Sequence, residues 1–337
     1  MLGHWQSDGE YIGSVDLSTE VPLRRRVTIS ASGLSISFLL SILGSCQTEF
    51  FCPMKKQPKG NLPNTIVIGA EKCGTTSLHY YLSLHPEIYM SAEKELNFFI
   101  AEGNWHKGID WYRSNFRMAA PIIGESSPLY TAFPKHQGVP ERMHALIPDA
   151  RLIYMVRDPI DRIISHYTHE YSIGKEHRTI QDTLSNPESN LIVLASNYYL
   201  QLEQYLKYYS KSCILIIPLE HLSEHRIETL KKIFRFLEVD DSFVTNKFEK
   251  IIHSSQHKGR KNRLGLLLKW MSDTRLARLF PTHFRMALGE ILYRPFTSRV
   301  LLPEFTEGLT SSMRSILKED IDRFREVSGY RLSSWRI

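Results

Sequence analysis

One short segment of the chain, residues 69–77, brings together glycine, lysine and hydroxyl side chains in the order GAEKCGTTS. A cation, hydroxyl groups and a glycine-containing turn are the means by which proteins bind phosphate and sulfate groups. The two glycines have the spacing of a Walker A loop, but Thr75 occupies the position of the Walker lysine and the cation is Lys72. The segment therefore predicts an anion-binding loop and disfavours a simple nucleoside triphosphatase. The alternative is an ordinary turn between a strand and a helix.

The residues on both sides of this segment predict the elements that position it. Residues 65–68 are a β-branched, apolar run that indicates a buried strand. From Thr75 onward apolar residues recur at helical spacing until Pro86 stops the helix, and Thr75 or Thr76 is the expected N-cap. A strand, a tight turn and a helix in this order direct the backbone N–H groups of residues 73–77 toward one point.

A second strand–turn–helix unit follows later in the chain. Residues 152–156 predict a buried strand, and Asp158 and Pro159 are typical of the N-cap and the first position of a helix. Arg157 then lies at the carboxyl end of a strand, where ligands bind in open α/β sheets, and is expected to bind a second phosphate. An ion pair of Arg157 with Asp158 or Asp161 is an equally good interpretation.

Further charged residues suggest acid–base chemistry and ligand closure. Glu93 and Glu95 precede an aromatic pair, and a carboxylate beside apolar rings can have a raised pKa and act as a base toward a hydroxyl. Glu220 follows a strand predicted over residues 213–218 and is interpreted as a magnesium ligand or a helix cap. Residues 253–263 are polar and basic and predict a loop that folds over an anionic ligand. Solvated loop charges are the alternative for both acidic and basic segments.

The composition of the whole chain sets wider bounds. Its 337 residues, 42% hydrophobic, are enough for one large core or two modest ones. The net charge of +6 and a pI near 9.0 suit an anionic cofactor or substrate, but no long basic run with interleaved aromatic residues indicates nucleic acid. Four cysteines are too few for a disulfide scaffold and lack the paired spacing of a zinc site. Cys73 and Cys213 are expected to be buried free thiols.

Taken together, these segments resemble the sulfotransferase family that uses 3′-phosphoadenosine-5′-phosphosulfate (PAPS), most closely its carbohydrate branch, the heparan sulfate sulfotransferases. The resemblance covers residues 62 to 335. Residues 68–78 resemble the family's 5′-phosphosulfate loop, and residues 152–167 resemble its 3′-phosphate element. The resemblance implies an α/β, P-loop-like three-layer fold in which a central, mostly parallel sheet is flanked by helices.

The resemblance also implies roles for particular residues. Lys72 is the expected catalytic cation, and Glu95 lies in the segment, Glu-Leu-Asn-Phe-Phe, that supplies the catalytic base in the heparan sulfate enzymes. No metal is expected. One departure is that Ser126 stands where several of these enzymes have a lysine, so a second catalytic cation is not expected there. The expected cofactor-binding residues come from three segments: Lys72, Cys73, Gly74, Thr75, Thr76, Ser77, Arg157, Ser165, Lys258, Gly259 and Arg260.

The predicted function is therefore transfer of a sulfuryl group from PAPS to a hydroxyl or amine of an acceptor, which the resemblance indicates is a carbohydrate. Two rivals belong to other classes. A P-loop kinase acting on a small acceptor would need magnesium and ATP, and the missing Walker lysine disfavours it. A non-catalytic glycan-binding protein would bind its glycan without nucleotide, and the retention of both Lys72 and Glu95 disfavours it.

The first 61 residues are expected to form a tail ahead of a sulfotransferase domain spanning residues 62–337. Residues 27–46 are uncharged and mostly apolar, and they are long enough to serve as a membrane or signal anchor. Six serines dilute this segment, and basic residues on both sides give it no orientation. No Asn-x-Ser/Thr sequon occurs, so a cytoplasmic location is expected. The alternative is a single-pass membrane protein with its catalytic domain in the Golgi lumen.

Overall fold

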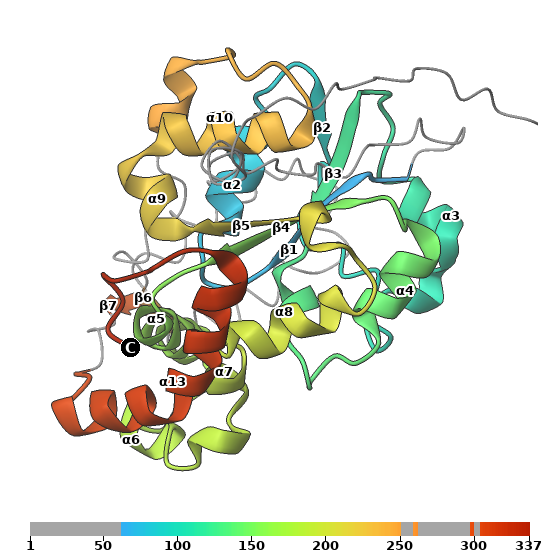
Figure 1. Ribbon diagram of the computed structural model, residues 1–337. Helices are drawn as coiled ribbons and strands as arrows, with labels where there is room; N and C mark the ends of the chain where they lie inside the picture. Colours follow the sequence, from blue (N-terminus) through green and yellow to red (C-terminus); the bar gives the residue numbers. More distant parts are fainter. Residues whose placement is uncertain (1–61, 251–258, 262–296, 300–303) are drawn as a thin grey trace, which may run out of the picture. The chain divides into compact units, whose positions relative to one another are not determined.

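The computed structural model describes residues 62–250, 259–261, 297–299 and 304–337 (Figure 1). The possible anchor at residues 27–46 and the predicted cofactor-binding residue Lys258 lie outside these ranges. So does a further helical stretch expected over residues 264–294. Within the described residues, no helix combines the length and the hydropathy needed to cross a bilayer.

A five-stranded sheet forms the centre of the described chain, with its strands in the order β2-β3-β1-β4-β5. All neighbouring strands are parallel, which confirms the predicted α/β fold with a central sheet. Parallel sheets are covered on both faces, and for this reason their strands are continuous apolar runs in the sequence. The strands are β1 Thr65–Gly69, β2 Ile88–Met90, β3 Ile122–Ser126, β4 Arg151–Val156 and β5 Ile214–Pro218.

Helices cover both faces of this sheet, and Figure 1 shows α2 and α10 on one side with α8 and α13 on the other. On the first side His85, just after α2, contacts Phe234 of α10 with ring centroids 4.5 Å apart. On the second side Tyr154 of β4 contacts Tyr198 of α8 and Phe324 of α13. The helices of these layers are α2 Thr75–Leu82, α8 Tyr198–Leu206, α10 Arg226–Leu237 and α13 Glu307–Ser328.

Among the described residues, six further helices lie in the connections between these elements. They are α3 Gly108–Arg113, α4 Val139–Leu146, α5 Pro159–Ser172, α6 Ile180–Thr183, α7 Leu191–Leu194 and α9 Leu219–Glu224. The predicted start of α5 is confirmed, because the Asp158 side chain accepts a hydrogen bond from the backbone N–H of Asp161. The predicted cap of α2 is wrong. Gly74 occupies the N-cap, with φ 81°, a left-handed conformation that favours glycine over a threonine.

The late basic segment also differs from its prediction. Instead of continuing as a loop, the backbone of Gly259–Lys261 forms strand β6, which pairs antiparallel with β7, Thr297–Arg299. Two predicted cofactor-binding residues, Gly259 and Arg260, are therefore in this strand. A strand of three polar residues has no alternation to detect, and its partner lies far along the chain, so local sequence could not predict the pairing.

Candidate functional site

The two predicted anion-binding segments leave the same edge of the sheet. β1 leads into the turn before α2, and its neighbour β4 leads into the turn before α5. The chain then runs from β1 toward β2 and β3 at one side of the sheet and from β4 toward β5 at the other. Such a reversal opens a crevice at the carboxyl ends of the strands, which is the usual ligand site of α/β sheets. The turn after β1 is tied to β4, since the N–H of Ala70 donates to the carbonyl of Met155 over 2.6 Å.

The start of α2 has the features of an anion site. No side chain caps this helix, and its first turn contains no acidic residue. Among the described residues, the structure gives the backbone amides of Thr75 and Thr76 no acceptor. Free N–H groups at the positive end of a helix dipole attract phosphate and sulfate groups. Lys72 belongs to the same turn and is half-buried.

The turn itself depends on close contacts that exclude larger residues. A Cβ atom at Gly69 would lie 1.8 Å from the Thr131 hydroxyl, and one at Gly74 would lie 2.6 Å from a methyl group of Leu219. The first contact leaves no room for a side chain. These packing contacts explain both glycines of the predicted loop, and they hold it between the exits of β3 and β5.

Arg157 directly follows β4, at the carboxyl edge of the sheet, with 24% of its side chain exposed. Its guanidinium is 3.4 Å from the Asp161 carboxylate, so the ion-pair interpretation is confirmed for Asp161, at a long distance that leaves most donors of Arg157 available. Ser165, predicted to share a phosphate with Arg157, is buried two turns into α5.

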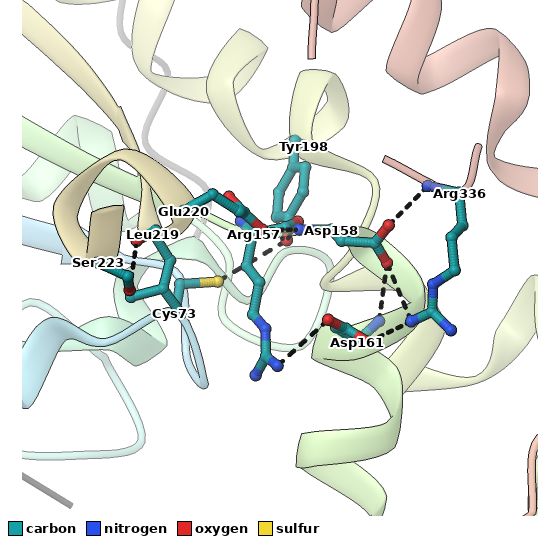
Figure 2. Close-up of polar contacts among 9 residues, drawn as sticks. All are labelled: Cys73, Arg157, Asp158, Asp161, Tyr198, Leu219, Glu220, Ser223 and Arg336. Atoms are coloured by element: carbon teal, nitrogen blue, oxygen red, sulfur yellow. Dashed lines mark hydrogen bonds and ion pairs between the residues drawn. The ribbon is translucent and has the colours of Figure 1, made fainter. Parts of the chain in front are cut away.

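The hydroxyl of Tyr198 joins the two predicted anion-binding segments, and Figure 2 shows it beside both. It donates to the carbonyl of Arg157 over 2.6 Å and accepts from the N–H of the same residue over 3.2 Å. The Cys73 thiol is 3.7 Å from the same oxygen. Sequence analysis gave Tyr198 no role, because no local pattern marks a contact across 41 positions.

The backbone N–H of Cys73 donates to the carbonyl of Ala70 over 3.2 Å, inside the turn before α2. Burial raises the pKa of its thiol to about 11, against the opposing effect of the nearby Arg162 guanidinium. The thiol is therefore protonated at neutral pH and is a poor nucleophile. Cys73 and Cys213 are both buried and free, which confirms the prediction for these two residues.

His166 of α5 lies near the Lys72 turn. Its Nε2 atom is 3.6 Å from the Glu71 carboxylate, an arrangement that would be an ion pair only if the ring were charged. Burial lowers the pKa of His166 to about 2, and the positive charges of Arg162 and Lys72 act in the same direction. The imidazole is therefore neutral. Its Nδ1 atom accepts a hydrogen bond from the Arg162 guanidinium over 3.0 Å. The contact between His166 and Glu71 places the turn before α2 next to α5.

Glu95 lies on the segment that follows β2. Its N–H donates to the carbonyl of Ser126 at the end of β3 over 2.9 Å. Its carboxylate is half-exposed and pairs with Lys94 at 2.8 Å. The aromatic residue Phe98 of the same segment is instead buried and stacks on Tyr112, with ring centroids 4.1 Å apart.

A second carboxylate, Glu125 of β3, is fully buried beneath this segment. The hydroxyls of Tyr112, Ser127 and Tyr130 donate to it over 2.6, 2.7 and 2.9 Å. Burial raises the pKa of Glu125, and the three donors act in the opposite direction. Ser127 also accepts the N–H of Asn97 over 3.0 Å, so Glu125 fixes the segment that carries Glu95. Sequence analysis missed this role, although an acid inside an apolar strand is a signal of a hydrogen-bonded buried charge.

Ser126, which stands in place of a lysine, is also buried. Its hydroxyl is 2.9 Å from Nδ1 of His79 on α2. Burial lowers the pKa of His79 to about 4, and the positive charge of Lys94 lowers it further. A neutral imidazole and a hydroxyl therefore occupy this strand exit, and Lys94 supplies a cation from the neighbouring segment.

The remaining predicted residues are placed as follows. The carboxylate of Glu220 accepts the N–H of Asp158 over 2.9 Å, so it stabilises the turn before α5. Gly259 and Arg260 lie in strand β6. Lys258 lies outside the described residues.

The chain belongs to the sulfotransferase domain family, whose sequence profile matches residues 62–274. The expected kinship with carbohydrate sulfotransferases is confirmed by two relatives. Human bifunctional heparan sulfate N-deacetylase/N-sulfotransferase 2 is 29% identical over 203 residues, 54% of this chain and 23% of that protein. Mouse heparan sulfate glucosamine 3-O-sulfotransferase 5 is 32% identical over 189 residues, 52% of this chain and 53% of that protein. The matches thus span about half or less of either relative.

A solved structure supports the fold. The sulfotransferase from Alicyclobacillus acidocaldarius superimposes with a TM-score of 0.59 at 22% identity, covering 82% of this chain and 99% of that one. At this identity the likeness establishes a shared architecture, and the P-loop-like α/β fold predicted from the sequence is confirmed.

Proposed function

We propose that this protein transfers the sulfuryl group of PAPS to a hydroxyl or amine of a carbohydrate acceptor. The observation that carries the proposal is that the turns after the neighbouring strands β1 and β4 are joined through the hydroxyl of Tyr198. A nucleotide with phosphate groups at both its 5′ and 3′ positions suits two such turns on either side of one crevice.

The donor supplies an activated S–O bond, and the chain supplies binding, orientation and fixed charge. The bond from sulfur to the 5′-phosphate oxygen breaks, a bond from sulfur to the acceptor oxygen or nitrogen forms, and adenosine 3′,5′-bisphosphate leaves. Negative charge grows on the leaving oxygen, where Lys72 and the N–H groups of Thr75 and Thr76 would stabilise it. Arg157 and Ser165 would hold the 3′-phosphate, which fixes the direction of transfer.

The acceptor's proton must go to a base as the new bond forms. Glu95 is proposed for this step, because it is half-exposed and its backbone is tied to Ser126. The ion pair with Lys94 would hold the carboxylate in one orientation until an acceptor displaces it. The buried Glu125 would act through positioning, since its oxygens are already occupied by three hydroxyl donors.

A carbohydrate acceptor is supported by the two relatives named above, whose names refer to heparan sulfate. The net charge of +6 also suits an anionic glycan.

The test is to incubate the full chain with PAPS and a panel of glycans, lipids and small alcohols, and to measure adenosine 3′,5′-bisphosphate. We expect release that depends on a glycan, and a loss of about 100-fold or more in kcat for Glu95→Gln with saturating acceptor. Lys107→Gln, an exposed lysine stacked on Trp111, is the control. Magnesium-dependent consumption of ATP would favour a kinase, and glycan binding without any product would favour a binding protein.

A further inference from the structure

The C-terminal end of the chain returns to the start of α5. The backbone N–H of Arg336 donates to the Asp158 carboxylate over 2.6 Å, and its guanidinium donates to the same side chain over 3.3 Å. The guanidinium also donates to Asp161. Figure 2 shows the Asp161 carboxylate between two arginines, with one oxygen facing Arg157 and the other facing Arg336.

Packing holds Arg336 in this place. Its neighbour Trp335 is 5% exposed and contacts Tyr198 and Phe324, with ring centroids 5.6 and 6.4 Å away. Arg314 of α13 donates to the carbonyl of Arg336 over 2.9 Å. Tyr198 is the same residue that binds the backbone of Arg157. The tail therefore shares its support with the proposed phosphate site and is more than a loose chain end.

The charges at this corner create a conflict for a bound phosphate. Asp158 and Asp161 place two carboxylates in the first turn of α5, next to the arginine proposed to bind the 3′-phosphate. Carboxylates repel a phosphate dianion, and Asp161 competes with it for the Arg157 guanidinium. Asp158 is 8% exposed, so solvent screens its charge poorly. A cation that pairs with both carboxylates, on the side away from Arg157, would reduce their repulsion of the phosphate and their competition for the Arg157 guanidinium.

We propose that Arg336 is a positioning residue for the 3′-phosphate: it neutralises Asp158 and Asp161 and so leaves the guanidinium of Arg157 available to the nucleotide. The inference rests on the proposed function, because it takes the ligand of Arg157 to be a 3′-phosphate. It extends that function by making the C-terminal tail a part of the donor site.

The charge mechanism has a signature that a purely structural role lacks. Loss of Arg336 should weaken only ligands that carry a 3′-phosphate, and removal of the Asp161 charge should restore them. If the tail merely holds the fold together, loss of Arg336 should affect all nucleotides alike, and Asp161→Asn should add further damage. Arg331 offers a matched control, because it is an exposed arginine of the same tail with no ion pair among the described residues.

The experiment is calorimetric titration of the full chain with adenosine 3′,5′-bisphosphate and with adenosine 5′-phosphate, which differ only in the 3′-phosphate. Arg336→Gln should raise the Kd of the bisphosphate about tenfold, the order expected for uncompensated charge at a half-exposed site. The Kd of the monophosphate and all values for Arg331→Gln should stay within about twofold of wild type. The double variant Arg336→Gln/Asp161→Asn should recover most of the lost affinity.

Equal losses for both nucleotides, or no recovery in the double variant, would overturn the inference. If Arg336→Gln does not fold, Arg336→Lys replaces it, and the expected result is a smaller loss that Asp161→Asn again removes. A wild-type chain that binds no adenosine bisphosphate would overturn the proposed function as well. Tight binding by wild type together with an unaffected Arg336→Gln would overturn this inference alone.

Discussion

Lys72 and Arg157 are both cations of the candidate site, but the proposed reaction uses them differently. Lys72 belongs to the turn before α2, where charge would develop as the sulfuryl group leaves, and Arg157 belongs to the turn before α5, where the phosphate charge is constant. A group that acts on developing charge changes kcat, whereas a group that acts on constant charge changes binding.

Lys72→Ala should therefore lower kcat about 100- to 1000-fold while leaving the Kd of adenosine 3′,5′-bisphosphate within a few-fold of wild type. Arg157→Ala should instead weaken that nucleotide about 10- to 100-fold, the range for a charge-assisted contact. Single-turnover rates and calorimetry separate the two effects. If both variants lost only kcat, by similar factors, the assignment of the two turns to opposite ends of one nucleotide would be wrong.

Residue types and spacing identified these two cations, but they did not identify the residues that support them. Sequence analysis assigned no role to Glu125 or to Tyr198. Both act through hydrogen bonds to residues that the fold brings close. The Arg336 contact with Asp158 spans 178 positions, so no local pattern contains it.

At the scale of elements, apolar runs and caps predicted the units that build the site. β1 covers Thr65–Gly69 against a prediction of 65–68, and α5 begins after Asp158 as expected. In these units the local propensity of the residues and their burial in the fold favour the same secondary structure, so the sequence alone predicts them. The cap of α2 was mispredicted because Thr75 and Thr76 suit an N-cap by type, whereas the left-handed turn requires glycine one position earlier.

Helix α8 is expected to fix the turn between β4 and α5 through a single hydroxyl group. Tyr198→Phe keeps the ring between Tyr154 and Trp335 but leaves the N–H and carbonyl of Arg157 without this partner. We expect a loss of about 1 to 3 kcal/mol in the free energy of unfolding. The Kd of adenosine 3′,5′-bisphosphate should rise several-fold, since the Arg157 backbone becomes less constrained.

Urea unfolding and calorimetry on the Tyr198→Phe variant measure these two effects. Tyr199→Phe is the control, because it removes a hydroxyl from the same helix without touching Arg157. Loss of stability with unchanged nucleotide affinity would mean that Tyr198 supports the fold but does not position the donor site.

At the scale of the whole molecule, the stability of the fold depends on pH through two neutral histidines. His79 of α2 contacts Ser126 of β3, and His166 of α5 contacts Glu71 in the turn after β1. Keeping both rings neutral lowers the stability of the folded chain in acid. His79 has its pKa lowered to about 4 by burial and by Lys94, compared with about 6.5 in an unfolded chain. Between these values the unfolded chain binds a proton that the folded chain excludes, so stability is full above pH 6.5 and falls as the pH drops. His166, with its pKa lowered to about 2, adds a contribution of the same sign.

His79→Asn isolates the first of these contributions, because asparagine can still accept a hydrogen bond from Ser126 but does not titrate. Free energies of unfolding in urea, measured between about pH 4 and 7.5, should fall more steeply with acid for wild type than for the variant. The difference should approach about 3 kcal/mol at about pH 4, since each unit of pKa shift corresponds to about 1.4 kcal/mol. His166 is present in both proteins, so its contribution cancels in the difference.

Replacing the exposed His106 by asparagine is the control and should leave the wild-type curve unchanged. Parallel curves for wild type and His79→Asn would show that His79 is not held neutral by the fold.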